Sequence, residues 1–516
     1  MIRFISAPVF GIAAYLDFLQ SSVLFFSRES IRLSVQRVKF DQSKTKTLQK
    51  VVNLGSVATL LGVPITIIVG YLQGYRSANF QDFLLKLPFH KLAIATLLVS
   101  TFLELAIEPI YCVYQYDLDI GKRTKFEGVA MFMKCAMTFV CVLLSSRFFE
   151  GREFDGVATL SFVLGQFAYS FTLFAMYLYS FSGFNKANNT NLQLFVVPVD
   201  EGKTIYFDFG SLQIFKSFFV QMIFKQLLTE GDRFLISYLC TIEEQGIYAI
   251  VTNYGSIIAR LLFQPLEEST RLMLTKVINN GSSDGDTRSL KASYFETFTY
   301  IKMICLFYFN LCLFIIFAGV TNGPFLLKFL IRRGDNWSKS DIYDLFLEYI
   351  AYIPFLAFNG IFEAIFTSAA KSDEVKRYSK FMTVMTISLL AVSYYLITIL
   401  DLRLSGLIIA NMLNMSLRMI YCFKAIAKYY GAAHINIDIF RVLQYITPSV
   451  IITAATFATQ HYIVFKGRSF IAKDWSELIQ GIIGSGILLF NLLILERQNL
   501  ERSIKSFFKK KEKKST

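Results

Sequence analysis

The chain has 516 residues, of which 54% are hydrophobic and only 17% are charged, and its formal net charge is +14. A soluble globular domain carries nearer a quarter of charged residues, so this composition excludes an ordinary soluble protein. The apolar residues gather in blocks that approach the length of about 20 residues that a helix needs to cross a bilayer. No strand pattern accompanies them, so the sequence predicts an all-α polytopic membrane protein.

Thirteen apolar segments follow one another along the chain and are predicted to span the membrane. They lie at 9–27, 50–74, 92–113, 128–146, 156–182, 212–239, 246–270, 303–329, 345–370, 381–399, 404–427, 442–465 and 475–496. An odd number of spans places the two termini on opposite sides. Lys and Arg are concentrated in alternate connections, among them 28–49 and 271–302, and in the tail from Arg497. Since cytoplasmic loops carry such an excess, these connections and the C-terminus are predicted to be cytosolic.

The basic tail ends in Lys513-Lys514-Ser515-Thr516. Its two lysines resemble the dilysine address that returns membrane proteins to the endoplasmic reticulum, which is read by a receptor and anchors nothing. The alternative is a plain basic tail that is attracted to an anionic leaflet. We expect no cleavable signal peptide before the first span. The first interpretation predicts a multi-pass protein of the endoplasmic reticulum membrane.

Two spans far apart in the chain carry the same pattern. One opens with Gly11-Ile12 and ends with Glu29-Ser30-Ile31-Arg32-Leu33, and the other opens with Gly246-Ile247 and ends with Glu268-Ser269-Thr270-Arg271-Leu272. Parallel repeats of this kind are typical of transporters built from two related bundles, although chance similarity between two apolar helices is the alternative. We therefore expect two pseudo-symmetric helical lobes plus two extra C-terminal helices. The predicted domains are an N-lobe at 1–182, a cytosolic inter-lobe loop at 183–211, a C-lobe at 212–427, the two extra helices at 428–496 and the basic cytosolic tail at 497–516.

The repeat also bears on the start of the chain. Span 246–270 follows another span, 212–239, whereas only eight residues precede span 9–27. We infer that one helix is missing from the N-terminus, through a shortened gene model or a real loss. A complete protein would then have fourteen spans and both ends in the cytosol.

Charged side chains inside spans are the candidates for function, because each costs about 2.5–3.5 kcal/mol at the centre of a bilayer. The densest group is Lys225, Glu230, Asp232 and Arg233 in span 212–239. This group lines a wet cavity or forms a structural cluster of ion pairs. Other charges within spans are Asp17, Glu104, Glu108, Lys134, Lys216, Glu348, Glu363 and Arg418, of which Lys134, Glu363 and Arg418 are further cavity or gating candidates.

A second polar stripe lies on span 246–270. Asn253 and Arg260 are seven residues apart and share one face of the helix, which Gln264 and Glu267 extend. Glu268 follows directly. With Arg260, these residues are further candidates to line a cavity between two bundles.

Arg28 and Arg32 stand at the cytosolic end of the first span. Together with Lys225, Arg233 and Arg260 they are the candidate ligands of a diphosphate, because the planar guanidinium can bind two phosphate oxygens at once. The alternative for Arg28 and Arg32 is a simple positively charged cytosolic loop.

No pattern of an enzyme accompanies these charges. The seven Cys lack the spacing of metal ligands, and neither HExxH, Walker A nor GxSxG occurs. We therefore predict no catalytic residue, no metal and no cofactor, and no nucleic acid as a partner. The sequence singles out no protein partner.

Several of these segments resemble one known family. Phe25–Arg32 is similar to the opening signature of the RFT family, and Lys225–Arg233 is similar to its central motif. The most specific match runs from Gln245–Tyr248 through Ala259–Ser269. Asn359-Gly360 with Glu363, Lys371-Ser372, and Gly406–Asn411 with Asn414-Met415 also fit the family.

The resemblance implies a eukaryotic endoplasmic reticulum protein of the multidrug/oligosaccharidyl-lipid/polysaccharide flippase superfamily. Its fold would be two six-helix lobes plus two extra helices that expose a central site to each face in turn. Its substrate would be a dolichyl-diphosphate-linked oligosaccharide of five mannose and two GlcNAc residues, moved from cytosol to lumen for protein N-glycosylation. The alternatives are a non-transporting accessory protein of the same pathway and a small-solute exporter of the same superfamily.

Three glycosylation sequons test the orientation. Asn336-Trp337-Ser338 lies on a predicted luminal loop, whereas Asn188-Asn189-Thr190 and Asn280-Gly281-Ser282 lie on predicted cytosolic loops. We expect the two cytosolic sequons to remain unglycosylated.

Overall fold

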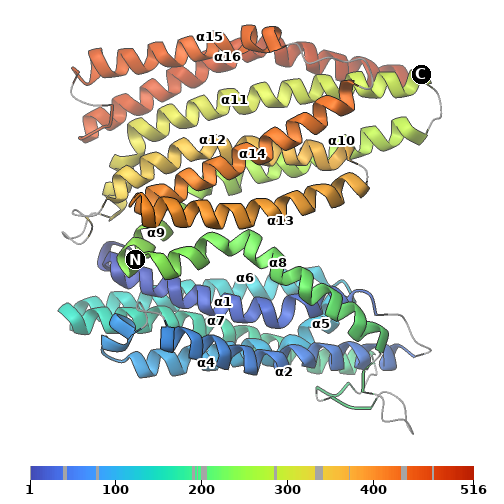
Figure 1. Cartoon of the computed structure of the whole chain (residues 1–516), viewed down its shortest axis with the longest axis vertical. Helices are drawn as coiled ribbons and strands as arrows, with labels where there is room; N and C mark the ends of the chain where they lie inside the picture. Colours follow the sequence, from blue (N-terminus) through green and yellow to red (C-terminus); the bar gives the residue numbers. More distant parts are fainter. Residues whose placement is uncertain are drawn as a thin grey trace. The chain divides into compact units, whose positions relative to one another are not determined.

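The structure is a computed structural model of the chain (Figure 1). It describes residues 2–38, 43–76, 81–188, 192–194, 196–198, 206–207, 209–283, 287–331, 337, 341–370, 372–431, 439–467 and 470–515. Within these ranges the regular elements are all helices. Two compact units are present, Met1–Ala249 with Arg333–Ser338, and Ile250–Arg332 with Lys339–Thr516.

The first unit is a bundle of long helices. Its elements are η1 (Ile2–Phe4), α1 (Ala7–Val35), α2 (Lys44–Arg76), η2 (Leu84–Lys86), α4 (His90–Ala106), α5 (Glu108–Tyr116), α6 (Ile120–Phe148), α7 (Gly151–Asn188) and α8 (Phe209–Leu239). Helix α1 packs along α2 and α8, while α7 packs along α4 and α6. Part of the core contains Tyr114 and Tyr177, whose ring centroids are 5.8 Å apart.

The second unit continues the helix that begins at the end of the first. Its elements are α9 (Ile242–Ile258), η3 (Ala259–Phe263), α10 (Gln264–Ser283), α11 (Thr287–Ile331), α12 (Ile342–Ala369), α13 (Ser372–Tyr394), η5 (Tyr395–Ile399), α14 (Arg403–Gly431), α15 (Ile439–Thr459), η6 (Gln460–Val464) and α16 (Trp475–Ser515). The turns η3, η5 and η6 are π-helical. Helices α15 and α16 pack against α11 and against each other, as the upper part of Figure 1 shows.

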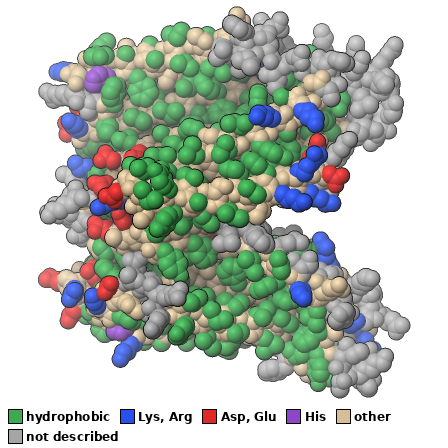
Figure 2. Space-filling view, in the orientation of Figure 1, with side chains coloured by type: hydrophobic (Ala, Val, Ile, Leu, Met, Phe, Trp, Pro, Cys, Tyr) green, Lys and Arg blue, Asp and Glu red, His purple; other side chains and the backbone are tan. Residues whose placement is uncertain are grey.

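The prediction of an all-α polytopic membrane protein is confirmed. Eleven helical segments in the described part of the chain are long and apolar enough to cross a membrane, and each overlaps a predicted span. Helix α8 and the helix formed by α15 and η6 contain the remaining two, 212–239 and 442–465. On the face drawn in Figure 2, hydrophobic side chains cover the middle of the helices and charged side chains gather toward their ends. Only 11% of the most apolar stretch of the helix Asp373–Ile399 is buried within the protein, as expected of a surface in contact with lipid.

One predicted span differs from the structure in an informative way. Span 92–113 is not one helix, because α4 ends at Ala106 and α5 begins at Glu108. Pro109 lies in the first turn of α5, where its ring removes a backbone donor and disfavours a straight helix. The carbonyl oxygen of Leu105 instead accepts a hydrogen bond from the hydroxyl of Thr59, at 2.7 Å. The hydroxyl of Thr59 on α2 therefore replaces the backbone hydrogen bond that Pro109, which has no N–H group, cannot donate to Leu105.

The two glycines that open the predicted repeat meet in the structure. A Cβ atom added to Gly11 would lie 1.9 Å from the carbonyl oxygen of Ile242, and one added to Gly246 would lie 2.1 Å from that of Ala7. Each glycine thus faces the carbonyl four residues before the other. This reciprocal crossing of α1 and the start of α9 is what two related helices would make about a pseudo-two-fold axis, and it requires glycine at both positions.

Candidate functional site

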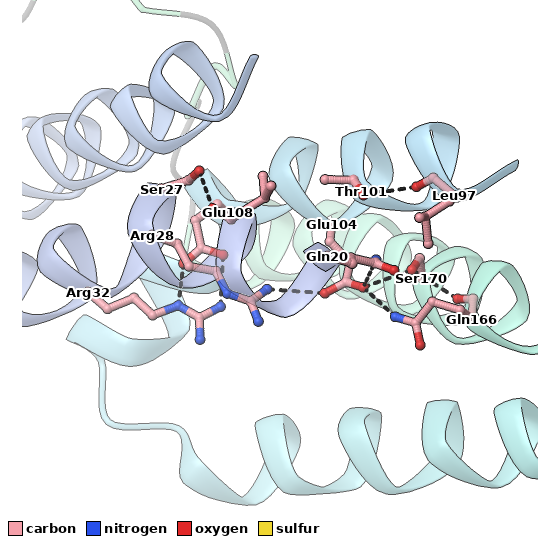
Figure 3. Close-up of polar contacts among 11 residues, drawn as sticks. Gln20, Ser27, Arg28, Arg32, Leu97, Thr101, Glu104, Glu108, Gln166 and Ser170 are labelled. Atoms are coloured by element: carbon pink, nitrogen blue, oxygen red, sulfur yellow. Dashed lines mark hydrogen bonds and ion pairs between the residues drawn. The ribbon is translucent and has the colours of Figure 1, made fainter. Parts of the chain in front are cut away.

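Two glutamates stand on either side of the break between α4 and α5, and both point toward α1 (Figure 3). Glu104 belongs to the last turn of α4 and Glu108 begins α5. Each forms an ion pair with an arginine of α1, Glu104 with Arg28 and Glu108 with Arg32. Four charged side chains are therefore tolerated at the depth of predicted spans because each neutralises another.

The carboxylate of Glu104 is bound on two sides by different kinds of donor. Its Oε2 accepts one hydrogen bond from Nη1 of Arg28, at 3.1 Å. Its Oε1 accepts from Nε2 of Gln20 at 3.1 Å, from Nε2 of Gln166 at 3.0 Å and from the hydroxyl of Ser170 at 2.9 Å. The three neutral donors come from α1 and α7 and fix the carboxylate on one oxygen, so the arginine contributes only one of its four hydrogen bonds (Figure 3).

The neighbouring pair, Arg32 and Glu108, is held from more sides. Two hydrogen bonds join them, one from Nε to Oε1 and one of 2.8 Å from Nη2 to Oε2. The Arg32 guanidinium also lies 3.7 Å from the centre of the Tyr111 ring, and Gln115 donates to its backbone carbonyl at 3.0 Å. Tyr111 is in turn contacted by Arg123 of α6, 4.4 Å from the ring centre. A bidentate pair on an aromatic ring leaves little of Arg32 free to bind another anion.

A cavity of about 340 Å³ opens beside Arg28. Glu104 and Gln166 contribute to its wall, and Lys134 of α6 contributes a second cation. Lys134 forms an ion pair of 3.0 Å with Asp17 of α1, and the Asp17 side chain is 57% exposed. Of the remaining lining side chains, three are apolar, namely Leu24, Phe25 and Met131, and four are polar or charged, namely Gln20, Ser21, Glu29 and Tyr169. This is the combination expected of a site for a ligand with an anionic and an apolar part.

The central motif on α8 is placed only in part. Arg233 and Glu230 lie one turn apart and form an exposed ion pair of 3.1 Å. The side chains of Lys225 and Asp232 lie outside the described residues. Helix α8 packs against α1, where the Phe234 ring meets the Phe18 ring at 4.9 Å. Neither Arg233 nor Glu230 lines the cavity beside Arg28.

A second cluster of charges lies in the second unit. Nη2 of Arg418 on α14 donates to Glu363 on α12 at 2.6 Å. Gly360, one turn before Glu363, receives the carboxylate of Glu267, whose Oε1 would lie 1.9 Å from a Cβ at that position. Glu267, Glu363 and Arg418 are thus brought to the same part of α12.

Arg260 lies on the π-helical turn η3. Its Nη2 donates to the backbone carbonyl of Asn253 at 3.0 Å, and the side chains of Asn253, Gln264 and Glu268 are exposed. No ion pair of Arg260 occurs among the described residues. Short π-helical turns are frequent at functional sites because they change which side chains share a face.

The sequence did not single out the neutral partners of Glu104. Gln20, Gln166 and Ser170 are neutral polar residues within otherwise apolar spans, and this position is the feature of the sequence that could have indicated a role for them. Glu104 itself was identified only as a charge within a span, because its partners lie 62 to 84 residues away along the chain.

The comparisons with known proteins assign the family. A family model described as "Rft protein" matches residues 1–506. The chain belongs to the Rft protein family. The resemblance seen in the sequence is thereby confirmed.

Two relatives of this Rft protein are named Man(5)GlcNAc(2)-PP-dolichol translocation protein RFT1. The one from Candida albicans is 48% identical over 508 residues, which cover 97% of this chain and 90% of the relative. The one from Saccharomyces cerevisiae is 34% identical over 538 residues, which cover 98% and 91%.

The fold of this Rft protein is similar to that of a solved structure, the lipid II flippase MurJ in its inward closed conformation. The TM-score is 0.56 at 13% sequence identity, with 96% of this chain and 94% of the other covered. At this identity the likeness concerns the fold alone. It supports the predicted architecture of two helical lobes with two extra helices.

Proposed function

We propose that this Rft protein translocates a dolichyl-diphosphate-linked oligosaccharide of five mannose and two GlcNAc residues from the cytosolic to the luminal face of the endoplasmic reticulum membrane. The lipid would serve protein N-glycosylation, and the two lobes would expose the site to each face in turn. The observation that carries this proposal is the 48% identity to a translocation protein of that name over nearly the whole chain. In this proposal the C-terminus is cytosolic, as the distribution of Lys and Arg predicts.

The chemistry of the cavity supports this substrate. A dolichyl diphosphate has an anionic centre between a polar sugar and a long apolar chain. Arg28 and Lys134 offer cations to the diphosphate, and both are reached from the cavity. Leu24, Phe25 and Met131 offer apolar surface beside them. Burial of the charged centre costs least where such cations stand at bilayer depth.

Not all the candidate cations have equal roles in this proposal. Arg28 and Lys134 in the first unit are the ligands we assign to the diphosphate, because neither is held by two bonds to a carboxylate. Arg260 in the second unit is a separate candidate ligand, whose guanidinium donates only to a backbone carbonyl. Arg32 is assigned a structural role, since its guanidinium is occupied by Glu108 and Tyr111.

The test is translocation by the purified protein in liposomes that contain labelled dolichyl-diphosphate heptasaccharide. Wild type should raise the rate of appearance of the lipid in the opposite leaflet above that of protein-free liposomes. Arg28→Ala and Arg260→Ala should each lower the protein-dependent rate at least about tenfold, the effect of one lost charge-assisted hydrogen bond. Arg403→Ala is the matched control, because Arg403 is an exposed arginine at the start of α14.

A wild-type rate equal to that of protein-free liposomes would contradict the proposal. If the same protein still bound the lipid, the accessory role in the pathway would be the better description. If Arg28→Ala and Arg260→Ala both had the wild-type rate of translocation, the diphosphate would have to bind to other residues.

A further inference from the structure

The two pairs that α1 forms between an arginine and a glutamate differ in a way that suggests different uses. Arg32 and Glu108 share two hydrogen bonds, whereas Arg28 and Glu104 share one. The side chain of Arg28 is 24% exposed, while that of Glu104 is 3% exposed. Only the pair of Arg28 and Glu104 lines the cavity. An anion that enters the cavity can therefore reach Arg28 but competes there with the buried carboxylate.

The surroundings of Glu104 indicate what happens when Arg28 is taken away. Three neutral donors, Gln20, Gln166 and Ser170, all bind Oε1 and would keep the carboxyl group in place. Oε2 would lose the hydrogen bond from its cation while it faces the cavity. A buried carboxylate without a cation is unfavourable, and the usual response is to bind a proton. The neutral acid can keep Oε1 as the acceptor for the three donors and carry the proton on Oε2.

We propose that the diphosphate replaces Glu104 as the partner of the Arg28 guanidinium. When Arg28 binds the substrate, Glu104 takes up one proton from the cavity. This inference rests on the proposed function and adds a coupling between substrate and proton at the same site. No bond other than the O–H bond of Glu104 is formed. By reciprocity, protonation of Glu104 must raise the affinity for the diphosphate by the same factor as the diphosphate raises the affinity for the proton.

Other titratable groups around Glu104 are few. Asp17 and Glu29 on α1, Lys134 on α6 and Tyr169 on α7 line the same cavity. Beyond the cavity lining, Glu108 is held by Arg32, and Glu127 on α6 is close enough to act electrostatically on Tyr169. Helix α2, which also packs against α4, has no charged residue between Lys50 and Arg76. Asp82 pairs with Lys86 at the surface and does not line the cavity, so Asp82→Asn offers a control.

The test measures proton uptake on binding. The probe is farnesyl-diphosphate N-acetylglucosamine, because a diphosphate diester has no phosphate that titrates near pH 6 as a monoester does. Titration calorimetry of the purified wild-type protein in buffers of different ionisation enthalpy gives the number of protons bound per probe. We expect close to one proton, with a dissociation constant that falls by up to about tenfold for each unit that the pH is lowered below neutral.

The variant Glu104→Gln isolates the carboxyl group. Its amide oxygen can accept from the three neutral donors, which leaves the NH₂ group facing Arg28, much as the protonated acid would present its O–H. We expect Glu104→Gln to bind the probe at least about tenfold more tightly than wild type above neutral pH, without proton uptake. Asp82→Asn should retain the uptake of one proton.

The outcomes separate the two proposals. Binding by wild type without proton uptake, or uptake that persists in Glu104→Gln, would overturn the exchange while leaving the lipid-binding site intact. No binding of the probe by wild type at any pH would count against the proposed function itself. The wild-type measurement decides the question even if Glu104→Gln does not fold.

Discussion

At the scale of single residues, α1 forms two ion pairs between an arginine and a glutamate, and the surroundings of these two pairs differ. Glu108 has Arg32 as its charged partner, in a pair with two hydrogen bonds. Glu104 has Arg28 and three neutral donors. Removal of the arginine should therefore lower the stability of the protein by different amounts in the two pairs, because breaking a buried pair is costly when the remaining charge has no other partner.

This difference predicts the stability of two matched variants. Arg32→Ala should lower the stability by about 3 kcal/mol, because Glu108 is 1% exposed and loses both charge-assisted bonds. Arg28→Ala should lower it by only about 1.5 kcal/mol, the lower end for a hydrogen bond to a charged group, because three neutral donors remain on the Glu104 carboxylate. Thermal denaturation of both variants in the same detergent gives the order of their midpoints. Equal midpoints, or a lower midpoint for Arg28→Ala, would contradict the contrast between the two pairs.

At the scale of elements, glycine decides how closely α1 and α9 approach. The carbonyl oxygens of Ile242 and Ala7 occupy the places where side chains of Gly11 and Gly246 would begin. Backbone oxygens cannot rotate away as a flexible side chain can. If either glycine gains a Cβ, the two helices must separate, and their separation removes the close packing around the crossing.

Gly11→Ala and Gly246→Ala should therefore each reduce the yield of monodisperse protein and lower the melting temperature. Overpacking of a well-packed interior costs about 1–3 kcal/mol, and a clash with backbone belongs at the upper end. Gly128→Ala on α6 is the control, because nothing lies within 4 Å of its added Cβ. Size-exclusion chromatography and thermal denaturation of the three variants test this. A wild-type profile for Gly11→Ala would show that the crossing is looser than the structure has it.

The sequence predicted the elements better than it predicted the site. Hydropathy located the spans, because the bilayer requires about 20 apolar residues of each helix. It did not separate α4 from α5, although Pro109 stands in the sequence at the break. It also did not pair Arg28 with Glu104, which lie 76 residues apart. Such pairs depend on which helices pack together, and a helix pattern alone contains no information about its neighbours.

At the scale of the whole molecule, the charges at the ends of the helices determine how the chain sits in the membrane. Lys and Arg dominate the tail that follows span 475–496, and this tail belongs to the long helix α16. Positively charged segments near the ends of spans remain in the cytosol during insertion. The same segments are attracted to the anionic lipids of the cytosolic leaflet, at about 1 kcal/mol for each Lys or Arg near the surface.

A fluorescent protein fused after Thr516 should therefore be digested by protease in sealed microsomes.

The sequon at Asn280 adds a second measurement, because α10 extends to Ser283 and carries this asparagine near its end. If α10 ends in the cytosol, Asn280 cannot meet the luminal glycosylation enzyme and treatment with endoglycosidase should leave the mobility of the protein unchanged at this site. An Asn280→Gln variant identifies any sugar that Asn280 carries. A protected fusion together with sugar on Asn280 would reverse the orientation, and the cavity beside Arg28 would then have to receive its substrate from the other face.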